Sequence, residues 1–353
     1  MIRDTQAAHG GPPHERAATS AAGPGRRTML TAGGGLALTA LLGGCRVRLE
    51  DDAPRIPLIP TRTPIPDEAL LILAWRECTE LARVAATLAA LQRLQGASLH
   101  TEQAETLRSV LATGRVPDSV VSASPAPTTG REAPGAATPG STSEGASGIP
   151  SGGPAGGGGG VRTATEAGAL ELGPLRVDRR SGLGAVTPTH AALWLSMLAC
   201  RSRLAAQLGV ATPWQPWPEQ PADGEATFLQ QVRGTLYAMQ VVAVRTSGAA
   251  RERATADLTW LDALRIRLES RAGSALGAPP VGYALPFPVT DGPSAARLAA
   301  HAWSGLQDAS GALLVAGSGD AARASMVVQL LTDVVAHGSA WGVRLRAFPG
   351  LVR

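Results

Sequence analysis

The sequence lacks several residue types and motifs that catalysis commonly requires. It contains no lysine and no asparagine, and all 32 of its basic residues are arginines. Without lysine there is no phosphate-binding loop of the Walker type, so Gly317–Asp320 is interpreted as an interhelical turn with a capping Ser or Asp. No Gly-x-Ser-x-Gly elbow precedes a plausible catalytic triad. These absences predict no catalytic residues, and hence a protein that is not an enzyme.

The chain also lacks the strong positive charge that nucleic-acid binding needs. Its formal net charge is +4, and residues 1–44 hold four arginines and two acids, so removing them leaves +2. A nearly neutral protein gives phosphate backbones little electrostatic attraction. No nucleic-acid partner is therefore expected.

Residues 1–44 have the three parts of an export signal. A polar, basic stretch ends at Arg27, an apolar stretch runs from Met29 to Leu42, and small residues follow. Arg26 and Arg27, followed by one polar and two apolar residues, match the twin-arginine pattern. The apolar stretch has about 14 residues, whereas a membrane-spanning helix needs about 20. We therefore predict a twin-arginine signal peptide and not a membrane span.

A lipidation site is predicted where this signal ends. Leu42-Gly43-Gly44-Cys45 resembles the lipobox of bacterial lipoproteins, whose cysteine thiol receives diacylglycerol before cleavage frees its amine. The alternative is an unrelated Cys45 after an ordinary export signal. Residues 45–66 contain five prolines, which forbid helix and favour an extended tether. The sequence thus predicts a lipid-anchored protein on the extracytoplasmic face of the cell membrane.

Residues 67–113 are predicted to form N-terminal helices. Asp67 and Glu68 provide an acidic start to an amphipathic run that should end near Gly96. A shorter helix, from about His100 to Ala112, is expected to fold back on the first.

Residues 114–186 are predicted to be a disordered insert. The part from 114 to 160 is dominated by Pro, Gly, Ser and Thr. It offers too little apolar surface to offset the entropy of ordering the chain. Within the insert, Ala169–Val177 is expected to make a short strand-like contact.

Residues 187–223 are predicted to form a helix and a loop rich in Trp and Pro. A hydroxyl cap and a first-turn proline at Thr187-Pro188 open a helix that runs to about Leu208. Trp214 and Trp217 then stand close together in the loop, where two such rings could form a recognition surface. The alternative is that the loop closes one end of a helical bundle.

Residues 224–353 predict four long amphipathic helices with apolar residues at three-to-four spacing. The second and third are joined by an extended, proline-rich connection, and no strand pattern of comparable strength competes. The predicted fold is all-α: a ferritin-like four-helix bundle with a crossover, plus the additional N-terminal helices. The four helices are expected at about Gly224–Thr246, Ala249–Ala272, Gly292–Ala316 and Asp320–Arg346.

The crossing and its surroundings resemble a known family. The crossing Gly282–Asp291, the helix start Ser294–Ala300 and the closing Phe348–Leu351 are similar in order and spacing to that family. It is the ferritin-like domain family of unknown function (domain of unknown function 4439) of actinobacterial secreted lipoproteins. An all-arginine basic composition, rich in Ala and Gly, suggests a GC-rich genome and agrees with such a source. The resemblance implies a ferritin-like bundle and brings no activity.

A ferritin-like fold raises the question of a di-iron site, which needs carboxylates and Glu-x-x-His pairs. The chain contains no Glu-x-x-His. Where related sequences carry an acid and a histidine before a tyrosine, this one has Gln230 and Gln231 before Tyr237, and amides bind iron poorly. No metal or other cofactor is therefore predicted. The alternative is a metalloprotein whose ligands are scattered acids and His301.

The charged and histidine side chains of the predicted helices give no further site. His190, His301 and His337 each lack a carboxylate in register on their own helix. The helix from 249 to 272 interleaves acids with arginines, which predicts a solvated, ion-paired face. The acids on that helix include Glu252, Asp257, Asp262 and Glu269.

Two cysteines remain after Cys45. Cys78 and Cys200 lie in the middle of predicted helices, and an exported protein works where disulfides persist. One hypothesis is a Cys78–Cys200 disulfide that joins the helices on either side of the insert. The other is two buried free thiols, since cysteine is often buried as a small hydrophobe.

Together these patterns predict a non-enzymatic, membrane-anchored helical protein that binds or scaffolds at the cell envelope. Its expected partners are the membrane, through the lipid anchor, and an unknown envelope protein or ligand. The alternatives are a ferritin-like metal-binding protein of the di-iron type and a carrier that holds an apolar ligand between its helices.

Overall fold

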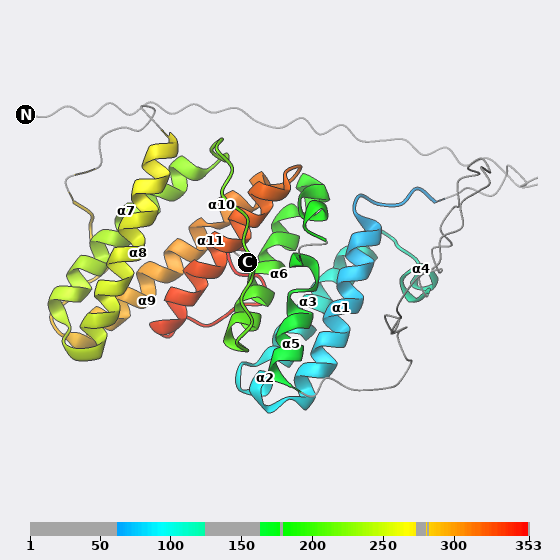
Figure 1. Cartoon of the computed structure of the whole chain (residues 1–353), viewed down its shortest axis with the longest axis horizontal. Coiled ribbons are helices and arrows are strands. Elements are labelled where there is room, and N and C mark those ends of the chain that lie inside the picture. Colours follow the sequence, from blue (N-terminus) through cyan, green and yellow to red (C-terminus); the bar gives the residue numbers. More distant parts are fainter. Residues whose placement is uncertain (1–61, 124–162, 177–178, 273–279, 281, 352–353) are drawn as a thin grey trace, which may run out of the picture. The chain divides into compact units, whose positions relative to one another are not determined.

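The computed structural model describes residues 62–123, 163–176, 179–272, 280 and 282–351, and within these ranges every regular element is helical (Figure 1). The predicted all-α class is confirmed. The longer helices are α1 Glu68–Thr87, α3 Gly96–Thr113, α6 Pro188–Gln207, α7 Glu225–Arg245, α8 Gly248–Ala272, α9 Gly292–Ala309 and α11 Ala321–Ala340. The shorter ones are α2 Ala89–Arg93, α4 Asp118–Ser122, α5 Ala164–Glu171, η1 Gly173–Leu175, η2 Arg180–Ala185, α10 Gly311–Leu314 and η4 Val315–Gly317.

Helices α1 and α3 lie side by side (Figure 1). The inner stripe of α1 is fully buried, with Leu71, Ala74, Cys78 and Ala85 at three-, four- and seven-residue spacing. The predicted single helix to Gly96 is wrong, because Leu88 adopts an extended conformation (φ −100°, ψ 116°) and ends α1. The following α2 and the start of α3 turn the chain back on itself.

The structure corrects the predicted disorder of residues 163–176 and 179–185. A capping box at Thr163 begins α5, and η1 and η2 follow it, so the predicted strand-like contact at 169–177 is wrong as well. Ala167, Leu172, Leu175 and Leu183 are buried, which is enough apolar surface to order this stretch. Residues 114–123 of the predicted insert are ordered as well, since α4 lies there and Val116 and Val121 are buried. Residues 124–162 and 177–178 lie outside the described residues.

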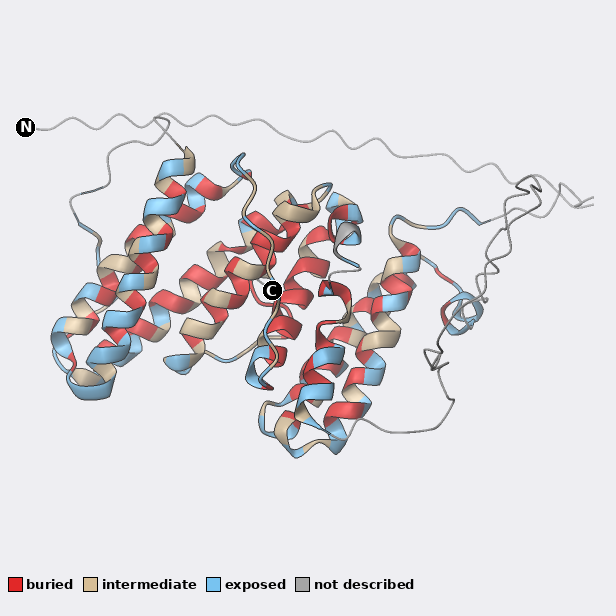
Figure 2. Cartoon of the chain, in the orientation of Figure 1, coloured by how far each residue is buried: buried red, intermediate tan, exposed pale blue. Residues whose placement is uncertain are grey.

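Helix α6 contacts both α5 and α11, and its buried residues cover several of its faces (Figure 2). Its beginning is tied to that of α1 by Asp67, which accepts hydrogen bonds from the Thr187 backbone N–H (3.1 Å) and hydroxyl (2.6 Å). Asp67 also pairs with His190 Nδ1 at 3.0 Å. Burial would raise the pKa of Asp67, but the bonds from Thr187 and His190 outweigh it and lower that pKa. The acidic residue predicted to start α1 therefore also holds α6.

The C-terminal helices form a chain of neighbours in which α8 contacts α7, α7 contacts α9, and α9 contacts α11. The predicted third helix is divided at Ser310 into α9, which ends at Ala309, and α10 and η4, which follow from Gly311. Gly311 lies so close to the Gly350 carbonyl oxygen that a side chain there would collide with it. The predicted last helix ends at Ala340, where Gly342 adopts a left-handed conformation (φ 84°) and Val343 N–H bonds to the Gly338 carbonyl. Since α11 also packs on α6, these helices share one core with the N-terminal ones.

Candidate functional site

The predicted Trp/Pro loop is fixed against helix α11. Trp217 Nε1 donates a hydrogen bond to Gln329 Oε1 at 3.0 Å, and the backbone N–H of Gln215 lies 3.4 Å from Ser325 Oγ. Trp214 is half-buried against the core. The loop therefore covers part of the helical core, in line with the interpretation that it closes the bundle. The ring of Trp217, however, remains only partly buried.

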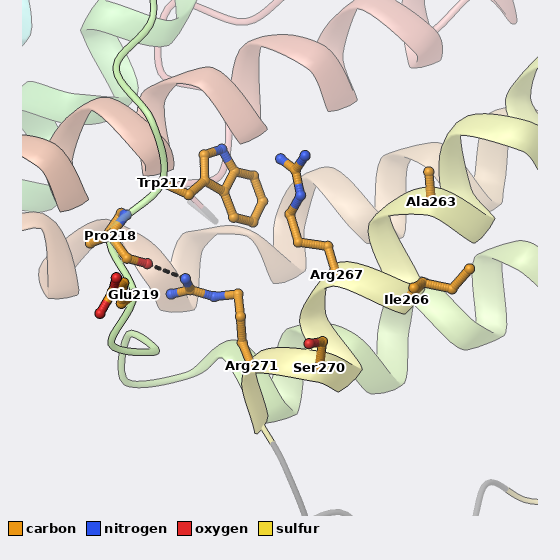
Figure 3. Close-up of a pocket in the computed structure, with 8 residues that line it drawn as sticks. All are labelled: Trp217, Pro218, Glu219, Ala263, Ile266, Arg267, Ser270 and Arg271. Carbon is orange, nitrogen blue, oxygen red and sulfur yellow. Dashed lines mark hydrogen bonds between the residues drawn. The ribbon is translucent and has the colours of Figure 1, made fainter.

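Trp217 forms one wall of a surface groove of about 800 Å³, whose other wall is helix α8 (Figure 3). Ala263, Ile266, Arg267 and Ser270 of α8 are all exposed along the groove. Ile266 keeps 54% of its surface exposed, so the groove offers apolar area to a partner.

Two arginines of α8 lie over the indole of Trp217, and the structure gives them different environments. Arg267 Cζ is 4.7 Å from the ring centroid, and Arg271 Cζ is 5.8 Å from it. Arg271 is held by both carboxylate oxygens of Glu225, at 2.9 and 2.8 Å, and by the carbonyls of Pro218 and Gln220. Its fork of donors fixes the loop to α8.

Arg267 is different because no acceptor of the described chain bonds its guanidinium. It is exposed and contacts Trp217 only through its π face. The groove therefore combines a partly exposed indole, an exposed Ile266 and one cation that is free to pair with an incoming anion. The sequence reasoning missed Arg267, although one signal was present: no acid stands three or four residues from it on α8.

A second polar cluster joins α8 to α11. Asp257 is 2% exposed, and its two oxygens accept from His337 Nδ1 at 2.6 Å and from Trp341 Nε1 at 2.5 Å. The His337 ring is stacked on Trp303, with centroids 5.1 Å apart and planes within 10°. Asp257 thus departs from the predicted solvated face, whereas Asp262 and Glu269 do pair with Arg265 as expected.

Asp333 lies one turn before His337 on α11. Burial raises the pKa of Asp333 to about 6, and the charge of His337 lowers it in part. The carboxylate is therefore partly protonated near neutral pH. The expectation that His337 lacks a carboxylate in register on its own helix is therefore wrong, because Asp333 lies four residues before it; the carboxylate that bonds His337, Asp257, comes from α8.

A third polar cluster lies between α1, α3, α5 and α6, where His100, Gln103, Glu171 and Arg201 are at most 1% exposed. His100 Nε2 lies 2.8 Å from Glu171 Oε1, and its Nδ1 lies 3.0 Å from Gln103 Oε1. Arg201 bonds Glu77 at 2.8 Å and the Glu171 carbonyl at 3.0 Å. Both ring nitrogens of His100 therefore have partners, and Arg201 is paired with carboxylates of two helices, Glu77 of α1 and Glu171 of α5.

The Cys78–Cys200 disulfide is not formed in the structure, where both cysteines are free and fully buried. The Cys78 thiol is directed to Gln103 Oε1 at 3.6 Å and to Met197 Sδ at 3.5 Å. Burial raises the pKa of Cys78 to about 12 and that of Cys200 well above its ordinary value. Both remain protonated, and a thiol is a poor nucleophile for disulfide exchange.

The candidate metal-site residues of α7 and α9 lie in a cleft that no acidic side chain lines. Gln230, Gln231, Tyr237 and His301 line a cleft between α7 and α9. Across the described ranges, no three His, Cys, Asp or Glu side chains come together in a group that could hold a metal ion.

The predicted export and lipidation residues, Arg26, Arg27 and Cys45, lie outside the described residues. In the described part of the chain, none of the helices combines the length and the apolar character needed to cross a bilayer.

Residues 226–353 match the model of a family described as Domain of unknown function (DUF4439). The match contains α7 to α11, and with them Arg267 and the Asp257 cluster, but it begins after Trp217. No curated protein and no solved structure matches the chain.

Proposed function

We propose that this chain is an exported, lipid-anchored binding protein of the cell envelope, and that the Trp217 groove is where it holds its partner. The observation that carries the proposal is the exposed, unpaired Arg267 guanidinium lying 4.7 Å above a partly exposed Trp217. Aromatic and Arg side chains dominate the binding energy of many interfaces. A partner segment with an apolar group beside a carboxylate could pack on Trp217 and pair with Arg267.

The proposal of a non-enzymatic role rests on the bonding of the polar clusters, whose side chains connect helices. His100, Glu171 and Arg201 are buried and bonded to other helices, and Asp257 bonds His337 and Trp341, so these groups hold helices together. The groove itself offers the cation of Arg267, the indole of Trp217, Ser270 and the carboxylate of Glu219. Glu219 lies on the loop and Ser270 on α8, with Arg271 between them (Figure 3), so the carboxylate is not beside the hydroxyl as a base beside a nucleophile would be.

The membrane anchor is proposed from Arg26, Arg27 and the lipobox that ends at Cys45. Its test is the mass of the N-terminal peptide of protein recovered from host membranes. A diacylated peptide that begins at Cys45, and that is lost in Cys45→Ala, would support the anchor. Replacing Arg26 and Arg27 together by Lys should block export, whereas Arg16→Lys, a matched change in the same leader, should not. An unlipidated or uncleaved terminus would contradict this part of the proposal.

The bundle of α7, α8, α9 and α11 is proposed to be ferritin-like. Support comes from the family match and from the connection of about 19 residues between α8 and α9, the place of a crossover in such bundles. An experimental structure in which these four helices superpose poorly on ferritin-like bundles would overturn it.

The binding role is tested by site-specific photocrosslinking in the host envelope. A crosslinker at Ile266 should capture a discrete partner, because that side chain lies open in the groove. Val244, which is 74% exposed and lies outside the groove, is the control position. Capture at 266 should weaken in Arg267→Ala. Equal adducts at both positions, or capture that ignores Arg267, would mean that the groove binds no specific partner.

A further inference from the structure

A second cleft, of about 450 Å³, lies between α7, α9 and the crossing segment. Thr227, Gln231 and Tyr237 of α7 line one side, His301 of α9 lines another, and Tyr283 to Pro286 of the crossing close it. Its volume falls in the range of roughly 300–1,000 Å³ that is typical of small-molecule sites. It shares no lining residue with the Trp217 groove.

No acidic and no arginine side chain lines this cleft. Arg297, a nearby cation, is turned away and lies 4.0 Å over the face of Phe287. The polar groups that do line it are mainly amides and hydroxyls, with one imidazole, and these both donate and accept hydrogen bonds. An ion would find no counter-charge here, so the lining suits an uncharged ligand that also donates and accepts.

The hydroxyl of Tyr283 is buried and has no hydrogen-bond partner within the described structure. The carboxamides of Gln230 and Gln231 likewise bond to none of the described residues. A buried hydroxyl without a partner costs free energy, and a hydrogen-bonding group of a ligand in the cleft would remove that cost. This separates the cleft from the His100 cluster, where the imidazole and the Gln103 amide already have partners.

Two aromatic rings provide the apolar part of the cleft. Tyr237 and Tyr283 are tilted at 43° with centroids 5.7 Å apart, and each is only partly buried. The Tyr283 ring packs beside Gly234 of α7. A pyranose ring has C–H faces that contact aromatic rings and hydroxyls around its edge that bond to amides.

We infer that the cleft between Tyr237, Tyr283 and His301 is a binding site for an uncharged, hydroxyl-rich ligand, namely a neutral sugar residue. The ring faces hold the C–H surface of the sugar, and the Tyr283 hydroxyl and the Gln230 and Gln231 amides bond to its hydroxyls. This site is independent of the proposed partner groove.

The test is ligand-observed saturation-transfer NMR with the full chain in detergent. The probes are glucose, galactose, mannose and N-acetylglucosamine, with glucuronate and glucosamine as charged counterparts. Saturation transfer should be seen for at least one neutral sugar and should be weaker for its charged counterpart. If no neutral sugar binds, or if the charged sugars bind equally well, the inference is wrong.

Tyr283→Phe removes only the orphaned hydroxyl and should weaken binding of the neutral sugar about tenfold, which is the loss expected for one hydrogen bond. Gln230→Glu, which adds a charge on an exposed position, should weaken it as well. Thr259→Ala, on the exposed face of α8 and away from the cleft, is the control that should not change binding. Circular dichroism checks that each variant folds. Unchanged affinity in Tyr283→Phe would place any sugar binding elsewhere.

Discussion

The buried polar side chains between α1, α3, α5 and α6 are bonded to one another, whereas α7, α8 and the crossing segment also carry polar side chains without a bonded partner beside two clefts. His100, Glu171 and Arg201 are at most 1% exposed and bond to one another or to backbone carbonyls. Arg267, Gln230 and Tyr283 have no bonded partner within the described structure. Buried charges that are hydrogen-bonded stabilise the fold, and polar side chains without a partner beside a cleft are available to bind a ligand.

The largest loss of stability is expected when a buried carboxylate is removed from beside its positively charged or hydrogen-bonding partners. Glu171→Ala should lower the free energy of unfolding by about 3–5 kcal/mol, because it removes the carboxylate that bonds the buried His100 and leaves the buried Arg201 with Glu77 alone. Glu80→Ala is the matched control: its pair with Arg83 is more than half exposed and should cost about 0–1 kcal/mol. Urea unfolding of both variants measures the difference. Similar midpoints for the two would contradict a structural role for the buried network.

A smaller change, a gain in the free energy of unfolding, is expected when Asp333 is replaced. Its pKa is raised to about 6, so the stability linked to its protonation is present below pH 4 and lost as pH rises through 6. Asp333→Asn removes this cost and should stabilise the protein by about 2–3 kcal/mol at pH 7.5.

Thermal unfolding of Asp333→Asn and the parent chain at pH 4 and pH 7.5 checks this. The gain should shrink strongly at pH 4, where most of the parent carboxyl is already protonated. A gain that is equal at both values would show that the pKa of Asp333 is not responsible.

The two arginines over Trp217 should separate a structural role from a binding role. Arg271→Ala breaks the nearly buried pair with Glu225 and should cost about 2 kcal/mol in unfolding free energy. Arg267→Ala removes an exposed, unpaired cation and should cost no more than about 0.5–1 kcal/mol. Chemical denaturation compares them. A large loss in Arg267→Ala would mean that it, too, serves the fold.

The smallest perturbation concerns the thiols. In the Cys45→Ala chain, Cys78 and Cys200 should resist iodoacetamide in the folded state, since both are buried and the pKa of Cys78 is raised to about 12. After denaturation without reductant both should react. Mass spectrometry counts the added groups. A denatured protein that takes up none would show that the two sulfurs are bonded after all.

Periodicity predicted the long helices well because each buries a stripe that the sequence itself displays. Helices α6, α7 and α8 begin and end within one or two residues of their predicted limits. The predictions were wrong where contacts with a distant segment determine the local structure. One such place is Gly311, which lies against the backbone of Gly350. Another is the stretch from α5 to η2, where four buried apolar residues follow a low-complexity segment. The Trp loop was identified from sequence as a candidate site, but the arginine above it was not.

The sequence by itself determined the all-α class and the positions of most helices, because these depend on residues that are neighbours in the chain. The leader with Arg26, Arg27 and Cys45 stays a prediction from the same kind of local pattern. Tertiary structure alone decided which polar groups have partners. Asp257 meets His337, Glu171 meets His100, and Tyr283 meets no acceptor among the described residues. These partners are about 70 to 80 residues apart in the chain, and only packing brings their atoms within hydrogen-bond distance.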